Sequence, residues 1–368
     1  MNHFSQYIID PRQYPDTAPT NMLLHQAEQI IRSDSKTKAH LISLLTQNLH
    51  NYLQEHNTLP ISVALAMVSN RTQYQTIWQA LDMVLWQQPF AFVVLPVVMV
   101  IGSEQQTIIQ NNIPEEKLTE CLLKQGLIKN TQDIVWAKNW LDDQQFSGIK
   151  IDEWFLASQS QEAATEFLNQ FSDEQKEITL GQQVLVQYAV GLVHCKDEIK
   201  LNAPISQFAM PLMNVFNAHF TQQQGLTIFT NPLAVQQPLA AMAKGSNMRL
   251  TMALDVFCAN AIRAIRLQGL RVGAVVVAQQ TNLLIFSFSP TDDSHHFETQ
   301  GFVWPLSSMD DIDLILNNFL NLLSDCQVEN IRFCQHIQAE DQPFLSYLAA
   351  LKEDGIHPFF SKNMEKTH

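Results

Sequence analysis

The spacing of apolar positions changes at about residue 89, and the change separates a helical part of the chain from a mixed part. Before it, three segments place apolar residues three or four positions apart: NMLLHQAEQIIRS, KTKAHLISLLTQNLHNYLQEH and YQTIWQALDMVLWQQ. This spacing is typical of amphipathic helices that bury one face. The sequence therefore predicts a helical N-terminal layer over residues 1–88.

The most apolar run of the chain, FAFVVLPVVMVIG at residues 90–102, marks the start of the mixed part. A helix needs about 20 apolar residues to cross a bilayer, and this run is shorter and contains Pro96. Its β-branched residues favour a buried strand. We therefore predict a strand here and no membrane insertion.

Three later stretches repeat one order of elements: a strand-like run, a shorter extended segment, a helix that follows a proline, another strand and a further helix. The prolines before the helices, Pro114, Pro204 and Pro305, fall at similar intervals. Self-similarity of this kind indicates internal duplication, although strands and helices also alternate in α/β proteins without repeats. We predict an α+β fold in which the helical layer, 1–88, precedes three β-β-α-β-α units, at 89–177, 178–268 and 269–368.

Composition and charge limit the classes of function that the protein can have. The chain has 46% hydrophobic residues, as globular proteins do, and a formal net charge of −14, which disfavours general nucleic-acid binding. The five scattered cysteines favour reduced thiols, and the N-terminus lacks the basic and apolar regions of a signal peptide. We expect a cytoplasmic protein.

One segment is basic, although the chain as a whole is acidic. Between residues 244 and 271 a single acidic residue, Asp255, stands against five basic ones: Lys244, Arg249, Arg263, Arg266 and Arg271. Such a segment can form ion pairs inside an acidic protein, or it can bind an anionic ligand, an acidic protein surface or, less readily, nucleic acid. These five residues are the candidate binding residues.

Other chemically suggestive stretches have simpler explanations. In SHHFETQGFVWPLSSMDD, residues 294–311, adjacent His295 and His296 would lie on opposite faces of a strand, so a hairpin leading into a capped helix is favoured over a metal site. Cys326, Cys334 and His336 match no zinc-site spacing. The stretch AKGSNMRL, residues 243–250, lacks the phosphate-loop pattern and predicts a loop between two helices. We therefore expect no metal and no cofactor.

The segments YQTIWQALDMVLWQQPFAFVVLPVVMVIG and FETQGFVWPLSSMDDIDLILNNFLNLLSDCQVENIRF resemble an uncharacterised family of proteobacterial proteins. That family combines a helical N-terminal part, an apolar strand with a proline, and a C-terminal turn of glycine, two hydrophobic residues, tryptophan, proline and leucine before an acidic helix. The match is most specific at residues 301–306, GFVWPL. The resemblance implies no activity, and the family's paired-cysteine tail is represented here only by Cys334.

Because no nucleophile and base, metal spacing or nucleotide loop stands out, we expect a non-enzymatic protein that binds another macromolecule, as a homo-oligomer or in an assembly with a protein partner. One alternative is a small-molecule enzyme, hydrolase-like, with its site between repeat units. A second is a ribosome- or nucleic-acid-associated factor that uses the basic segment.

Overall fold

The computed structural model describes residues 18–68, 70–101, 107–109, 112–172, 177–179, 184–194, 196–224, 228–279, 283–290, 301–306, 310–328 and 330–335. Contacts within the chain group it into two compact units, unit 1 (Met1–Arg249) and unit 2 (Leu250–His368). This grouping does not test the predicted boundaries at 88, 177 and 268, which stay a prediction. Each unit is described by itself.

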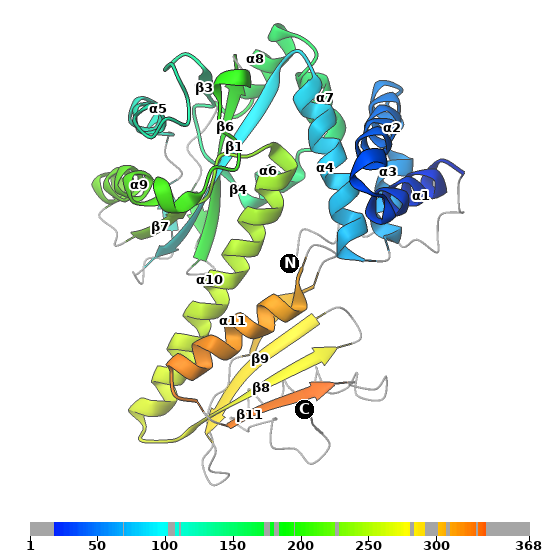
Figure 1. Cartoon of the computed structure of the whole chain (residues 1–368). Helices are drawn as coiled ribbons and strands as arrows, with labels where there is room; N and C mark the ends of the chain where they lie inside the picture. The colour runs from blue at the N-terminus through cyan, green and yellow to red at the C-terminus, as the bar shows by residue number, and fades with distance from the viewer. Residues whose placement is uncertain are drawn as a thin grey trace. The chain divides into compact units, whose positions relative to one another are not determined.

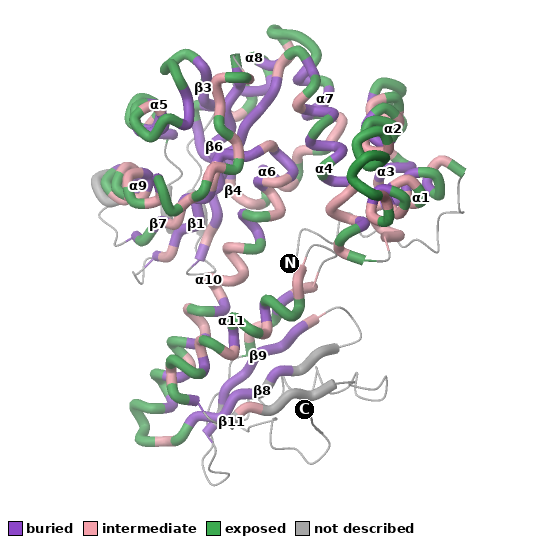
Figure 2. Tube along the Cα trace, in the orientation of Figure 1, coloured by how far each residue is buried: buried purple, intermediate pink, exposed green. Residues whose placement is uncertain are grey.

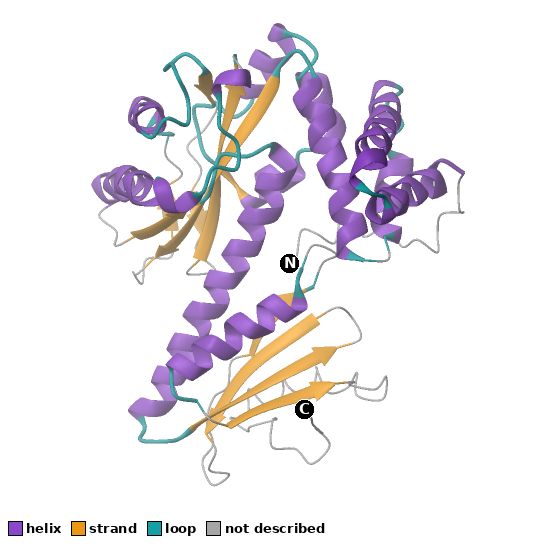
Figure 3. Ribbon diagram, in the orientation of Figure 1, coloured by secondary structure: helices purple, strands orange, loops and turns teal. Residues whose placement is uncertain are grey.

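The fold is α+β, as predicted, with a helical N-terminal region followed by strands and helices (Figure 3). The N-terminal helices are α1 (Ala18–Arg32), α2 (Ser35–Gln54), α3 (Leu59–Met67) and α4 (Arg71–Gln87). Asp34 caps α2 by accepting from the backbone of Lys36 and Thr37, and Asn70 caps α4 by accepting from that of Gln73. The three predicted helices correspond to α1, α2 and α4, and α1 packs against the other three helices.

The sheet of unit 1 is built around two long antiparallel strands, β1 (Ala91–Ile101) and β6 (Val184–Val193). The shorter strands β3 (Ile134–Trp136) and β4 (Leu141–Asp142) pair with β6, and β7 (Ile228–Pro232) pairs with β1, which gives the order β3-β6-β1-β7. Every residue of β1 except Val100 is buried. The prediction of a buried strand at this apolar run is confirmed.

Helices cover both faces of this sheet (Figure 1). On one face α5 (Glu115–Lys124) and α9 (Ala209–Gln224) share an apolar core with β1, which includes Leu95, Leu122 and Phe216. The other face carries α6 (Asp143–Gly148), α7 (Ile151–Ala157) and α8 (Gln161–Asn169). There Phe92 of β1 meets Trp154 and Phe167, with ring centroids 5.4 and 5.1 Å apart. The alternating side chains of β1 thus serve two cores, and Figure 2 shows most of the strand as buried.

Four smaller elements and the first part of a long helix are the other described elements of unit 1. Strands β2 (Thr107–Ile109) and β5 (Glu177–Thr179) form a two-stranded antiparallel ribbon, and the 3-10 helices η3 (Lys196–Glu198) and η4 (Ile205–Gln207) lie between β6 and α9. Helix α10 (Pro238–Leu267) begins in unit 1 and ends in unit 2. No helix of the described residues is long and apolar enough to cross a membrane.

Unit 2 has its own sheet and core. Its elements are β8 (Val272–Gln279), β9 (Leu283–Pro290), β10 (Gly301–Pro305), α11 (Ile312–Asp325) and β11 (Asn330–Gln335), and the strand order is β10-β9-β8-β11. Among the described strand pairs of this sheet, β11–β8 is parallel and the others are antiparallel. The core joins Cys258 and Ile262 of α10 to Phe286 of β9 and Phe319 of α11.

The prediction that three units share one connectivity is wrong. In the first two predicted units the last strand pairs with the first strand of the other unit: β3 with β6, and β7 with β1. In the third, β11 pairs with its own first strand, β8. The strand-like run predicted at the start of this unit, at residues 271–289, contains both β8 and β9. Hydrophobic periodicity specifies which face of a strand is buried, but not which strand lies beside it.

Two further predictions concern single elements. Residues 243–250 lie inside α10, so the predicted loop between two helices is wrong. The predicted hairpin is formed by the antiparallel pair β9 and β10, while the residues between these strands, 291–300 with His295 and His296, lie outside the described residues. The cap of α11, predicted at Ser307 or Ser308, is instead Asp311, which accepts from the backbone N–H of Leu314 at 3.1 Å.

Candidate functional site

A cavity of about 430 Å³ opens in unit 1 between strand β3 and helix α8. We call it the β3–α8 cavity. It has the volume of a ligand pocket, for which about 300–1,000 Å³ is common. Its lining comes from separate stretches of the chain: Asn112, Ile113, Glu115, Val135, Trp136, Ala137, Lys138, Gln161, Thr165, Leu168, Asn169, Ser172, Leu192 and His194.

The pleat of the sheet explains the apolar part of this lining. Val135 pairs with Leu192 across β3 and β6, so both side chains lie on the face that α8 covers. Leu192 is buried, whereas Val135 is 41% exposed. Trp136 points to the opposite face, where its ring belongs to the core and donates to Thr119 Oγ1 at 3.2 Å. Its backbone is therefore the part that lines the cavity.

Ile113, Ala137 and Leu168 add further apolar lining, and the polar part of the lining is mostly uncharged. It combines the amides of Asn112, Gln161 and Asn169 with the hydroxyls of Thr165 and Ser172. Glu115 and Lys138 add charges of opposite sign and His194 adds an imidazole, all on exposed residues. An amide side chain both donates and accepts hydrogen bonds, as a peptide group does. This set therefore suits a neutral ligand with alternating donors and acceptors.

The cavity also adjoins an edge of the sheet. Among the described strands, β3 and β7 are the two ends of the order β3-β6-β1-β7. At the β7 edge, Asn217 of α9 accepts from the backbone N–H of Thr230 at 3.1 Å, and Pro232 has no N–H to offer. Capping groups and prolines of this kind protect sheet edges from further pairing. Within the described residues, the β3 edge is paired only just after the strand, where the carbonyl of Lys138 accepts from the backbone N–H of Ile113 at 2.9 Å, and the cavity lies beside this edge.

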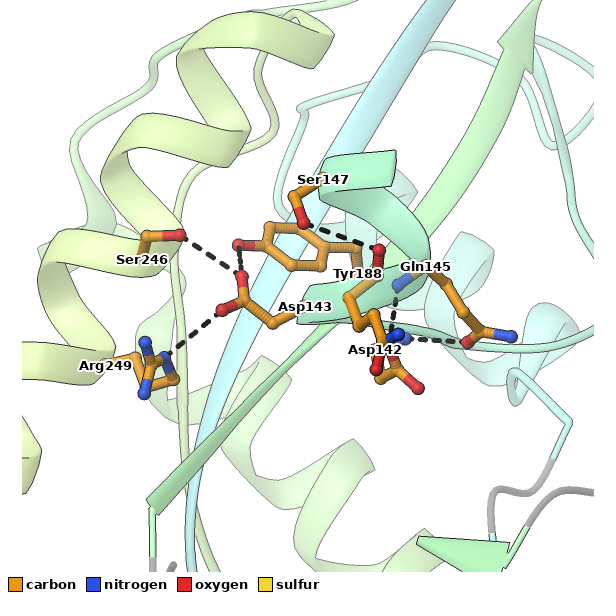
Figure 4. Close-up of polar contacts among 8 residues, drawn as sticks. Asp142, Asp143, Gln145, Ser147, Tyr188, Ser246 and Arg249 are labelled. Carbon is orange, nitrogen blue, oxygen red and sulfur yellow. Dashed lines mark hydrogen bonds and ion pairs between the residues drawn. The ribbon is translucent and has the colours of Figure 1, made fainter. Parts of the chain in front are cut away.

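A second polar cluster surrounds Asp143 at the start of α6 (Figure 4). The helix starts here because Asp142 and Gln145 form a capping box. This places the Asp143 carboxylate beside β6 and α10, where Oδ1 accepts from the Tyr188 and Ser246 hydroxyls, each at 3.2 Å. Oδ2 lies 3.5 Å from Nε of Arg249.

The cluster around Asp143 connects three elements rather than exposing reactive groups. Tyr188 is fully buried and stacks on Phe146, with ring centroids 4.1 Å apart. Burial, together with the charge of Asp143, holds the pKa of Tyr188 well above its usual value, so its hydroxyl stays a hydrogen-bond donor. Ser246 is 5% exposed, and its hydroxyl donates to a carboxylate. This geometry favours structural attachment of α10 over catalysis.

The five candidate basic residues have different environments. In unit 1, Lys244 donates to Asn202 Oδ1 at 3.0 Å and Arg249 pairs with Asp143. In unit 2, Arg266 Nη2 donates to the carbonyl of Cys326, just after α11, and to that of Gln327. Arg263 and Arg271 lie on exposed positions. Arg249 thus forms an internal ion pair, and Lys244 forms an internal hydrogen bond to an amide. Anion binding by Arg263 and Arg271 stays a prediction.

Charge-reversal variants of Arg266 and Arg263 distinguish a residue that stabilises the fold from one that is only exposed. Arg266→Glu should lower the free energy of unfolding by about 1–2 kcal/mol, because it removes charge-assisted hydrogen bonds and places an anion at the negative end of α11. Arg263→Glu, one turn away on the same helix, is the matched control and should change it by about 0.5 kcal/mol or less. Thermal or urea unfolding of both variants measures the difference. Equal effects would contradict the capping role of Arg266.

Metal-ligating residues do not converge in the part of the chain that the structure describes: no group of three or more His, Cys, Asp or Glu side chains could hold a metal ion there. Cys121, Cys258 and Cys326 are free, and burial raises the pKa of the Cys258 thiol. The side chain of Cys334 and all of His336 lie outside the described residues.

Sequence reasoning did not find the β3–α8 cavity. Its polar residues are common surface types without a motif, and they come together only through the packing of α8 beside β3. Comparisons of the chain with protein-family models, with curated proteins and with solved structures found no match. The resemblance at residues 301–306 is therefore neither supported nor refuted.

Proposed function

We propose that this protein is a non-enzymatic binding protein, and that the β3–α8 cavity receives an extended segment of a partner polypeptide. The observation that carries the proposal is an amide-lined cavity of about 430 Å³ beside the edge strand β3. Extended peptides bind sheet edges by main-chain hydrogen bonds, and adjacent pockets select alternate side chains.

The lining supplies both parts of such a contact. The backbone of Trp136 and the amides of Gln161 and Asn169 provide donors and acceptors for peptide groups. Val135 and Leu168 provide apolar surface for a side chain of the partner, and Val135 is accessible enough to make that contact. The mixed charges of Lys138 and Glu115 favour a partner segment without strong net charge.

The enzyme alternative predicted a site between repeat units. The cluster around Asp143 occupies such a place, since Asp143 belongs to the predicted unit 89–177 and Tyr188, Ser246 and Arg249 to 178–268. Its hydroxyls are buried and engaged with the carboxylate, so they offer no open nucleophile. The binding function is therefore the one that the geometry supports best.

The test starts from peptides selected on the full chain from a displayed library of random segments of about 10 residues, longer than a typical strand. Val135→Glu puts a charge on the apolar surface of the cavity. It should lower the affinity for the selected peptides by at least about tenfold. Fluorescence polarisation with labelled peptides measures the dissociation constants. The melting temperature should change little, since Val135 is 41% exposed.

Leu156→Glu is the matched control, because Leu156 is 44% exposed on α7 and does not line the cavity. It should leave peptide affinity unchanged. The proposal is wrong if no peptide binds more tightly than roughly 100 μM, or if Val135→Glu and Leu156→Glu weaken binding equally.

A further inference from the structure

The hydrogen bonds between β3 and β6 show which backbone groups of β3 face the free edge of the sheet. The N–H of Ala137 donates to the carbonyl of Val190 in β6 at 2.8 Å, so the backbone of Ala137 faces β6. Along an antiparallel strand this direction recurs at every second residue, and the residues between have their N–H and C=O on the other side. Val135 therefore also faces β6. Ile134 and Trp136 direct their N–H and C=O towards the free edge.

The chain itself occupies part of this edge and then leaves it. Just after β3, the N–H of Ile113 donates to the carbonyl of Lys138 at 2.9 Å, in an antiparallel contact. The residue after Ile113 is Pro114, which has no N–H, and α5 begins directly behind it. The pairing therefore stops before it reaches Trp136. Among the described residues, the outward N–H and C=O groups of Ile134 and Trp136 have no hydrogen-bond partner.

A strand added at this edge would direct one of its side chains into the β3–α8 cavity. Its residue opposite Val135 lies between the two residues that bond to the outward groups of β3. Opposite residues of neighbouring strands project to the same face, and Val135 projects to the face that α8 covers. There the side chain would meet Val135 and Leu168 as apolar surface, with Gln161 and Thr165 of α8 beside them. The side chains before and after it would point to the other face, away from the cavity.

We propose that the partner segment joins the sheet of unit 1 as a strand antiparallel to β3, that it bonds to Ile134 and Trp136, and that the cavity selects a large apolar side chain at the position between. This inference rests on the proposed peptide binding and specifies its geometry. Antiparallel pairing continues the direction of the Ile113 contact and is slightly more stable per residue than parallel pairing. Pro114 and the start of α5 limit the new strand at one end, so the segment that pairs is short.

Backbone methylation of a selected peptide tests the pairing. Each amide nitrogen of the peptide is methylated in turn, and its dissociation constant for the full chain is measured by fluorescence polarisation. Two positions separated by one residue should lose at least about tenfold in affinity, because each N-methyl group removes a hydrogen bond to β3 and places a methyl group against the strand. The position between them should tolerate methylation, since its N–H points away from β3.

Alanine substitution of the same peptide locates the side chain that enters the cavity. Alanine at the position between the two methylation-sensitive residues should lower the affinity about 10–100-fold, since a large apolar side chain is lost from the cavity. With the Val135→Ala protein this loss should be smaller, because part of the contact is already gone. With Leu156→Ala, the matched control outside the cavity, it should stay the same.

A methylation-sensitive position that coincides with the alanine-sensitive one would overturn the antiparallel pairing, because a parallel strand bonds to β3 through the residue opposite Val135. Methylation without an alternating effect would overturn strand addition itself, while the proposed binding would stand as long as Val135→Glu still lowers the affinity. If no peptide binds more tightly than roughly 100 μM, the proposed function is wrong and this inference with it.

Discussion

Gly245→Ala should destabilise unit 1, although alanine is the better helix former. Gly245 lies inside α10, where alanine would normally add about 1 kcal/mol of stability. A Cβ at this position would lie 2.7 Å from the hydroxyl oxygen of Tyr188 and 2.8 Å from its Cε1. Tyr188 is fully buried and stacked on Phe146, so its ring cannot yield. We expect a net loss of about 2 kcal/mol, or roughly 4–8 °C in melting temperature.

Gly148→Ala is the matched control for this substitution. Gly148 is the last residue of α6, and a Cβ there meets nothing within 4 Å. Its replacement should leave stability unchanged or raise it slightly. Calorimetry of the two variants gives the comparison. A Gly245→Ala protein as stable as Gly148→Ala would show that the contact with Tyr188 does not restrict the helix.

Asp143→Ala should destabilise unit 1 by a larger amount than a change at an exposed carboxylate would. It removes the acceptor for two buried hydroxyls, those of Tyr188 and Ser246, and the ion pair with Arg249. Loss of an acceptor for buried donors costs about 1–3 kcal/mol, and loss of a partly buried ion pair adds to it. Because the Asp143 side chain is 33% exposed, solvent screens part of the ion pair. We expect about 2–4 kcal/mol in the free energy of unfolding, measured with urea.

A double-mutant cycle with Tyr188→Phe tests whether the lost hydrogen bond to Asp143 causes this destabilisation. In the wild type, loss of the Tyr188 hydroxyl should cost about 1 kcal/mol, because a hydrogen bond to Asp143 is lost. In the Asp143→Ala background it should cost little, because the hydroxyl has already lost that acceptor. Glu162→Ala, at an exposed first-turn carboxylate of α8, controls for the loss of one negative charge at a helix start. Equal effects of Tyr188→Phe in both backgrounds would contradict the assigned contact.

Local sequence patterns were sufficient for elements whose stability is local. The helical spacing before residue 89 predicted α1, α2 and α4, and the apolar run at residues 90–102 predicted the buried strand β1. Both patterns extend over 13 to 21 neighbouring residues, and a face of such a segment is buried wherever the segment packs. The α+β class followed from the same patterns.

Proline and glycine were harder to interpret, because their effects depend on distant neighbours. Pro96 interrupts a central strand, a position that normally argues against one. It is tolerated because regular pairing with β7 ends beside it, where Pro96 still accepts from the backbone N–H of Leu233. Gly245 and Ser246 suggested a loop, yet they lie in a helix and face Tyr188 and Asp143, far away in sequence.

The sequence by itself determined the class of fold, most of the N-terminal helices and the burial of the central strand, because periodicity and caps act between near neighbours. Only the tertiary structure decided that β3 pairs with β6 and β7 with β1, since strands of similar periodicity offer equivalent backbone edges. It alone brought α8 beside β3 to form the cavity, and Asp82 to the start of α10. Those contacts join segments far apart in the chain, and no spacing along the sequence encodes them.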